Sequence, residues 1–141
     1  MTKVDFYILA DQQLEKRLDF ACRLVEKAFN SRCQICIQCN DTEQAEAVNK
    51  LLWEFKQTSF VPHTLHSEDS QSPVVICTEG QMPNEFDVLV NLADKIPSHF
   101  TRFNRVLEIV IQQDHILATT REHYKFYKDR GYALNNIDMR M

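Results

Sequence analysis

The sequence alternates between short apolar runs and longer stretches in which apolar residues recur at helical spacing. Short apolar runs bounded by polar or turn residues are typical of buried strands. Apolar residues at every third or fourth position are typical of amphipathic helices. The alternation therefore predicts an α/β protein with a Rossmann-like three-layer fold, in which a mostly parallel central sheet lies between helices on both faces.

Predicted strands and predicted helices largely alternate along the chain. The predicted strands are residues 4–9, 33–39, 74–77, 87–92 and 105–111. The predicted helices are residues 12–29, a segment that ends near Phe55, a short connection at 97–103 that turns Phe100 and Phe103 inward, and 115–129. Aspartate is favoured at helix N-caps, so Asp11, Asp41 (with Gln44 three residues later) and Asp114 are predicted as caps of the three long helices.

A length of 141 residues predicts one domain, residues 1–141, with a buried core of its own. Within it, the polar segment of about residues 66–73 is predicted to be a flexible surface loop. Residues 133–141 are predicted to be a C-terminal tail whose Leu134 and Ile137 can pack back on the domain. No apolar run approaches the roughly 18 residues that a membrane span needs, and the N-terminal run carries a charge that a signal peptide would lack.

Five cysteines, an odd number, stand in a chain with no predicted signal peptide, which indicates free thiols and a cytoplasmic location. Cys33, Cys36 and Cys39 follow a C-x-x-C-x-x-C spacing that raises a metal-binding hypothesis. Side chains alternate along a strand, however, so Cys36 would point away from the other two. His63 and His66 lie in a loop without an obvious third ligand. No metal site is predicted.

Only two glycines, Gly80 and Gly131, occur in the whole chain. Loops that cradle phosphate need glycines so that backbone N–H groups can approach the ligand. The first strand-to-helix turn, residues 8–12, has none, and Asp11 would place a negative charge there. The sequence also lacks a nucleophile elbow and a Cys–His signature. We therefore expect no nucleotide cofactor, no nucleotide-binding loop and no catalytic residues.

The last predicted helix carries a basic stripe on a chain whose formal net charge is −4. Arg121, Lys125 and Lys128 fall at i, i+4 and i+7 on one helical face, with Tyr124 and Tyr127 between them. One interpretation is a solvated helix whose tyrosines pack inward. The other is an anchor for an anionic ligand, either a carboxylate-bearing peptide or a phosphate.

A second candidate surface surrounds Trp53, which lies to the side of the apolar line of its helix. The segment 60–63 after that helix is apolar but contains Pro62, so neither a helical nor a strand period continues through it. Phe60 and Trp53 either form an exposed aromatic patch, of the kind that marks an interface, or complete the core beneath the loop.

Three segments carry a family resemblance that spans essentially the full chain. They are residues 6–9, Leu52-Trp53 followed by 59–65, and 121–135. In these the chain resembles the chi subunit of bacterial DNA polymerase III, an accessory protein of the clamp loader. The resemblance implies a Rossmann-like fold that does not bind nucleotide. It also implies a non-catalytic, cytoplasmic adaptor that bridges the psi subunit and the acidic, phenylalanine-ended C-terminal tail of single-stranded DNA-binding protein.

The resemblance also implies two sets of site residues. The implied tail site is Arg121, Tyr124 and Lys125, with Lys128 nearby and Val110 in an apolar floor. The implied psi-binding side is Trp53, Phe60, Val61, Pro62 and His63. The resemblance leaves open whether Trp53 serves this side or the tail site. One position departs: some relatives have a lysine where this chain has Leu117, so either the tail binds more weakly or Lys128 and Arg130 contribute more.

Two other functions stay open at this point. A small-molecule or nucleotide-binding enzyme would use the carboxyl edge of the sheet, and nucleotides would then raise its melting temperature. Direct nucleic-acid binding through the last helix would need a broad basic face, which a net charge of −4 does not favour.

Overall fold

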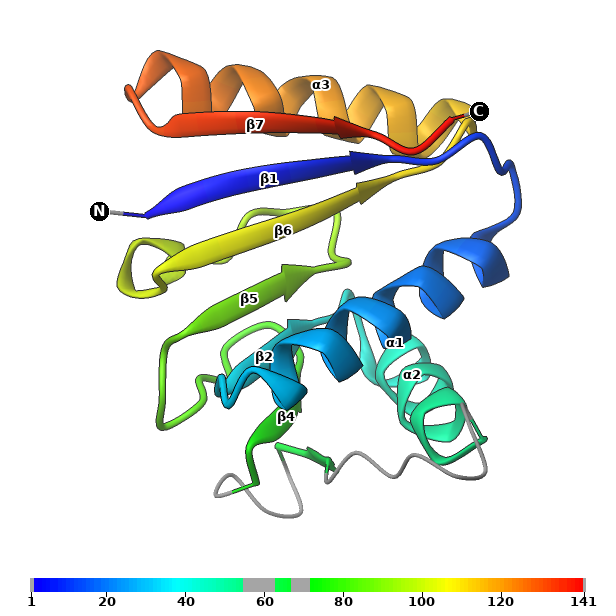
Figure 1. Cartoon of the computed structure of the whole chain (residues 1–141), viewed down its shortest axis with the longest axis vertical. Helices are drawn as coiled ribbons and strands as arrows, with labels where there is room; N and C mark the ends of the chain where they lie inside the picture. The colour runs from blue at the N-terminus through cyan, green and yellow to red at the C-terminus, as the bar shows by residue number, and fades with distance from the viewer. Residues whose placement is uncertain (1, 55–62, 67–71, 141) are drawn as a thin grey trace.

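Seven parallel strands form one sheet with the order β3-β4-β2-β5-β6-β1-β7, as every strand pair has the parallel register (Figure 1). The computed structural model describes residues 2–54, 63–66 and 72–140. The predicted α/β class and parallel sheet are confirmed.

The helices and strands have the following bounds. The strands are β1 (Lys3–Ile8), β2 (Ile35–Gln38), β3 (Thr64–Leu65), β4 (Val74–Cys77), β5 (Val88–Asn91), β6 (Arg105–Val110) and β7 (Ala133–Asp138). The helices are α1 (Leu14–Asn30), α2 (Thr42–Glu54) and α3 (Asp114–Asp129), with a short 3-10 helix η1 (Phe100–Arg102). Among the helices of the described residues, none combines the length and apolar character needed to cross a bilayer.

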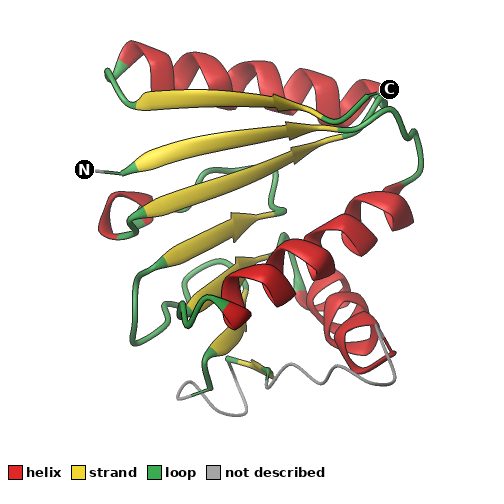
Figure 2. Cartoon of the chain, in the orientation of Figure 1, coloured by secondary structure: helices red, strands yellow, loops and turns green. Residues whose placement is uncertain are grey.

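The sheet separates two apolar cores. Helices α1 and α2 cover one face, and α3 and η1 cover the other (Figures 1 and 2). Phe100 and Phe103 are buried in the second core, as predicted. Strand alternation divides the cysteines in the same way: Cys39 and Cys33 belong to the first core and Cys36 to the second. All three are free thiols, and the described residues contain no cluster that could hold a metal ion.

The predicted cap of α2 is confirmed, whereas the other two are wrong. The Gln44 amide donates to Asp41 Oδ1 (2.8 Å), and the Gln44 side chain accepts from the Asn40 amide (2.7 Å). Helices α1 and α3 instead begin after Gln13 and Gln113, neither of which makes a side-chain cap. Asp114 lies inside the first turn, where the positive end of the helix dipole stabilises its negative charge.

The C-terminal segment is the main error of the sequence prediction. Residues 133–138, predicted as a tail, form the edge strand β7, which pairs along its whole length with β1. An edge strand has a neighbour on one side only, and β7 alternates weakly because its middle holds two exposed asparagines, Asn135 and Asn136. Leu134 packs against the second core, as expected. The short strand β3 was also missed, since two residues carry no period.

A buried polar network fastens α3 to the sheet. At its centre is Glu108 of β6, which is 3% exposed and accepts hydrogen bonds from Asn91 Nδ2 (3.1 Å) and the Tyr127 hydroxyl (2.9 Å). His123 of α3 contacts Glu108 through Nδ1 (3.0 Å) and the Asp94 carbonyl through Nε2 (2.7 Å). Because both ring nitrogens face acceptors, the doubly protonated imidazolium satisfies this geometry best. The network fixes how far α3 stands from the strands beneath it.

The network makes the stability of the protein depend on pH. Burial by itself lowers the pKa of His123, whereas the hydrogen bond and charge of Glu108 raise it, and the net shift is upward. A raised pKa in the folded state gives stability that is present below the unfolded pKa of about 6.5 and is lost as pH rises through the folded pKa. We therefore expect the free energy of unfolding of the wild-type protein to fall as the pH rises above about 6.5.

Urea denaturation at several pH values tests this expectation. The His123→Gln variant is the control, since it lacks the titrating group, and the difference between the two profiles isolates the histidine. If the difference in stability between the proteins stays constant from pH 5.5 to 9, the charged state assigned to His123 is wrong.

Candidate functional site

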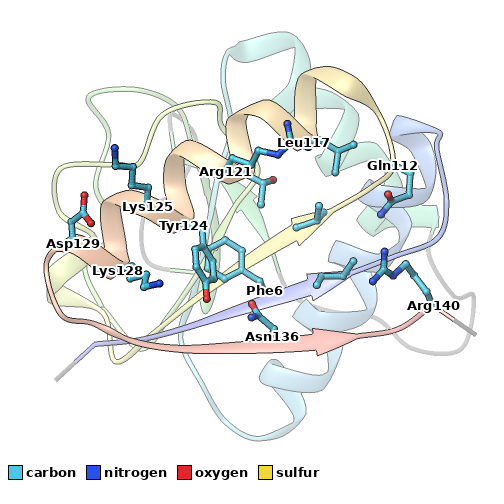
Figure 3. Close-up of a pocket in the computed structure, with 13 residues that line it drawn as sticks. Phe6, Gln112, Leu117, Arg121, Tyr124, Lys125, Lys128, Asp129, Asn136 and Arg140 are labelled. Carbon is cyan, nitrogen blue, oxygen red and sulfur yellow. The ribbon is translucent and has the colours of Figure 1, made fainter.

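A groove of about 600 Å³ runs between α3 and the strands β1, β6 and β7 (Figure 3). Its lining includes all five residues that the family resemblance implied for the tail site: Val110, Arg121, Tyr124, Lys125 and Lys128. The other lining residues are Phe6, Ile8, Gln112, Leu117, Thr120, Asp129, Asn136 and Arg140. Three strands and one helix, distant in sequence, thus meet at one concave surface.

The floor of the groove is apolar. The register pairs Ile8 of β1 with Val110 of β6, and Phe6 lies two residues before Ile8 on the same face of the sheet. The Tyr124 ring of α3 packs on Phe6 with 5.3 Å between ring centroids. Tyr124 itself is only partly buried and lines the groove beside the floor. This arrangement forms an apolar surface that an aromatic or aliphatic side chain of a ligand can cover.

The rim of the groove is mostly basic. Arg121, Lys125 and Lys128 are exposed along one face of α3, as their spacing predicts. In Figure 3, Lys125, Lys128 and the acidic Asp129 lie toward one end, and Arg121 and Tyr124 lie near the middle. Toward the other end lie Leu117, Gln112 and Arg140. The groove therefore combines an apolar floor with four cations and one carboxylate.

Leu117, the position at which the family resemblance suggested a lysine in some relatives, lines the groove. Arg130, suggested by sequence as a substitute cation, is not among the lining residues. Its guanidinium lies 3.7 Å over the ring of Phe126. Arg140 is instead the additional cation of the groove. Sequence reasoning missed Arg140 and Asn136 because it did not predict β7.

Trp53 and His63 form the second candidate surface. Trp53, near the end of α2, is 61% exposed, as its place off the apolar line predicts. The ring centroids of Trp53 and His63 lie 5.1 Å apart in an edge-on arrangement. The fold thus brings together two residues that are ten positions apart in the sequence. Phe60, Val61 and Pro62 lie outside the described residues, as does most of the predicted loop at 66–73. The surface is distant from α3, across the width of the sheet (Figure 1).

The carboxyl edge of the sheet holds a separate hollow of about 660 Å³. Its charged lining consists of Asp41, Glu79 and Asp94 together with Lys95 and the ionisable His99. Burial lowers the pKa of His99, which favours its neutral form. A lining with three carboxylates and one lysine is poorly suited to a phosphate-bearing ligand. The hollow gives no support to a nucleotide site.

The fold and the groove together define a class: an α/β protein with an all-parallel sheet that presents a basic, apolar-floored groove on one helix-covered face. The family model described as "DNA polymerase III chi subunit, HolC" matches residues 1–135. The chain therefore belongs to the DNA polymerase III chi subunit family, as the resemblance predicted.

Several relatives are similar over nearly their whole length. The chain is 35% identical over 136 residues to DNA polymerase III subunit chi of Pseudomonas aeruginosa, with 96% of each chain covered. It is 29% identical to the subunit chi of Haemophilus influenzae, with 92% of each chain covered. It is 28% identical to that of Escherichia coli, with 96% of this chain and 97% of the relative covered.

Proposed function

We propose that this protein is a non-catalytic adaptor of the DNA polymerase III holoenzyme. In this role it binds the acidic C-terminal tail of single-stranded DNA-binding protein at the α3 groove and the psi subunit at the Trp53 surface. It thereby links the clamp loader to coated single-stranded DNA during replication. Family membership supports the place in the holoenzyme. The observation that carries the binding proposal is the groove, where Arg121, Tyr124, Lys125, Lys128 and Val110 meet.

The chemistry of the groove matches that of a phenylalanine-ended acidic peptide. Such a peptide brings an aromatic ring, an α-carboxylate and aspartates behind them. The apolar floor around Val110 and Tyr124 can take the ring, since a volume of about 600 Å³ is in the usual range of ligand pockets. Arg121 offers a planar fork of donors that suits a carboxylate. Lys125 and Lys128 provide a diffuse positive rim for the aspartates.

A peptide fits the groove better than a phosphate does. The floor of Phe6, Ile8 and Val110 is apolar and would leave most of a phosphate without donors. Rim charges mainly set association rate and salt sensitivity, so we expect the tail to bind faster at low salt. The small contact area favours weak to moderate affinity, which suits transient handover at a replication fork.

A pull-down tests the proposal directly. Immobilised wild-type protein is expected to retain intact single-stranded DNA-binding protein and to lose it when its acidic tail is removed. Single-stranded DNA alone serves as the second arm. Equal retention of the intact and truncated proteins, or strong retention of bare DNA, would contradict binding through the tail.

The exposed Trp53 surface gives a prediction for the psi subunit. Exposing a tryptophan side chain to water is unfavourable, and exposed tryptophans frequently anchor protein–protein interfaces. We expect Trp53→Ala to weaken co-purification with psi at least tenfold, because interface tryptophans contribute about 2 kcal/mol or more. Binding of the acidic peptide is expected to stay unchanged.

The matched control is Leu14→Ala, which also shortens an exposed apolar side chain. If the Trp53→Ala protein co-purifies with psi at the wild-type level, Trp53 does not belong to the psi site. Loss of peptide binding as well would place both partners on one shared surface.

A further inference from the structure

Arg140 reaches the groove because the sheet register continues beyond β7. The Met139 amide donates to the Ile8 carbonyl (2.8 Å), so the chain is still held against β1 after Asp138. Alternation along an extended chain places Asn136, Asp138 and Arg140 on one side. Asn136 pairs with Phe6 and Asp138 with Ile8, both floor residues. Arg140 therefore follows a row of residues directed toward α3, and it lines the groove.

The Arg140 guanidinium is held by a single neighbouring carboxylate. Its Nε donates to Asp138 Oδ1 and its Nη2 to Asp138 Oδ2, both at 2.9 Å. The Arg140 amide also donates to Asp138 Oδ1 (2.9 Å). A guanidinium has five N–H donors, and these contacts use two of them. Three donors thus remain for a second acceptor on a side chain that is already oriented, which reduces the entropy lost on binding.

The charges of the groove are unevenly distributed. The end toward which Lys125 and Lys128 lie also holds Asp129, whereas α3 presents the apolar Leu117 toward the other end (Figure 3). Arg140 is the cation at this second end within the described lining. Within the part of the groove that the structure describes, an acidic peptide that extends past Arg121 in this direction meets a cation only at Arg140.

We propose that Arg140 is a further binding residue of the groove, which receives a side-chain carboxylate of the acidic peptide whose terminal carboxylate is bound at Arg121. The proposal rests on the proposed function of the groove and adds a contact for one aspartate at the end of the groove opposite Lys125 and Lys128. Asp138 is the positioning residue that orients Arg140. Both residues lie outside the range 1–135 that the family model matches.

A double-mutant cycle between protein and peptide tests the proposal. Full-length wild-type, Arg140→Ala and Arg140→Lys proteins are titrated with an acidic peptide ending in Asp-Ile-Pro-Phe, and with the same peptide after every Asp is replaced by Asn. Arg23→Ala is the matched control, since it removes one exposed cation from α1 on the other face of the sheet. Fluorescence anisotropy at low salt measures each dissociation constant.

We expect Arg140→Ala to weaken the acidic peptide about threefold relative to Arg23→Ala, as an exposed charge pair contributes on that scale. Arg140→Lys should recover part of the loss. With the Asn peptide, the Arg140→Ala and Arg23→Ala proteins should bind equally. Equal affinities for the acidic peptide would overturn the proposal, as would an equal loss for both peptides, which would indicate a structural role.

The failure of this inference is distinguishable from failure of the groove itself. If Arg121→Ala weakens the peptide but Arg140→Ala does not, only the role of Arg140 is wrong. If Arg121→Ala also has no effect, the proposed function of the groove is wrong, and the inference fails with it.

Discussion

Arg121→Ala is expected to weaken binding of the acidic, phenylalanine-ended peptide by about thirtyfold. Arg121 lies near the middle of the groove, beside Tyr124 and above the apolar floor (Figure 3). A charge-assisted hydrogen-bonded pair contributes about 2 kcal/mol, and a tenfold change in affinity corresponds to about 1.4 kcal/mol. Truncating the side chain leaves the terminal carboxylate without its planar partner. Isothermal titration at about 50 mM salt measures the loss.

Two further variants make this result specific. Arg121→Lys keeps the charge but removes the fork of donors, so we expect an intermediate affinity. Arg23→Ala, on the opposite helix layer, should leave the affinity within about twofold of wild type after correction for net charge. Superimposable titration curves for Arg121→Ala and the wild-type protein would show that Arg121 does not bind the peptide. The assigned orientation of the ligand would then be wrong as well.

Glu108→Ala is expected to lower the free energy of unfolding by about 3–5 kcal/mol, since removing one partner of a buried ion pair leaves the other charge uncompensated. Glu108 is almost fully buried and joins Asn91, His123 and Tyr127 in one network. The alanine also leaves the Tyr127 hydroxyl without its acceptor. Urea denaturation at pH 6, where the imidazolium of His123 is favoured, should show the full effect.

The network has a matched surface control on α3. Glu122 is exposed on the same helix, one position before His123, and Glu122→Ala should change stability by no more than about 0.5 kcal/mol. Glu108→Gln keeps the shape but not the charge, so its loss should fall between the two. A Glu108→Ala protein as stable as Glu122→Ala would show that the network contributes little to the attachment of α3.

The attachment of α3 matters for the groove because one wall of the groove belongs to this helix and the other to the sheet. Arg121 and Tyr124 come from α3, while Phe6 and Val110 come from strands. On the same helix, His123 lies between Arg121 and Tyr124 in the sequence, and Tyr127 follows Tyr124 by three residues. Both hold the helix against β6. A firmly attached helix keeps the groove at its width before a ligand arrives, which lowers the cost of binding. Variants of Glu108 that still fold should therefore bind the peptide more weakly.

Much of the fold follows from the sequence pattern itself. Largely apolar runs such as 105–111, which Glu108 interrupts, form almost fully buried strands, because a parallel sheet covered on both faces needs mainly apolar side chains on both sides. The period of 3.6 residues in 115–129 predicts α3 almost to the residue. The scarcity of glycine predicts that the first strand-to-helix turn does not form a glycine-rich phosphate loop. These features are local, so no tertiary information is needed to predict them.

The basic stripe shows where local information ends. Helical spacing alone places Arg121, Lys125 and Lys128 on one exposed face of α3, and the structure confirms that face. The choice between a solvated helix and an anion anchor depends on what lies opposite. Spacing within one helix contains nothing about Phe6 or Val110, which reach the groove through strand register.

Only the tertiary structure decided the second wall of the groove. The segment ALNNID has two polar residues in its middle, and it becomes strand β7 because β1 offers an unpaired edge along its full length. That pairing is a long-range backbone interaction, which side-chain periodicity does not encode. It brings Asn136 and Arg140 opposite α3, although they follow Arg121 by 15 and 19 positions in the sequence. The sequence by itself determined the parallel α/β fold and the cations of the helix, and the sheet edge determined the groove they share.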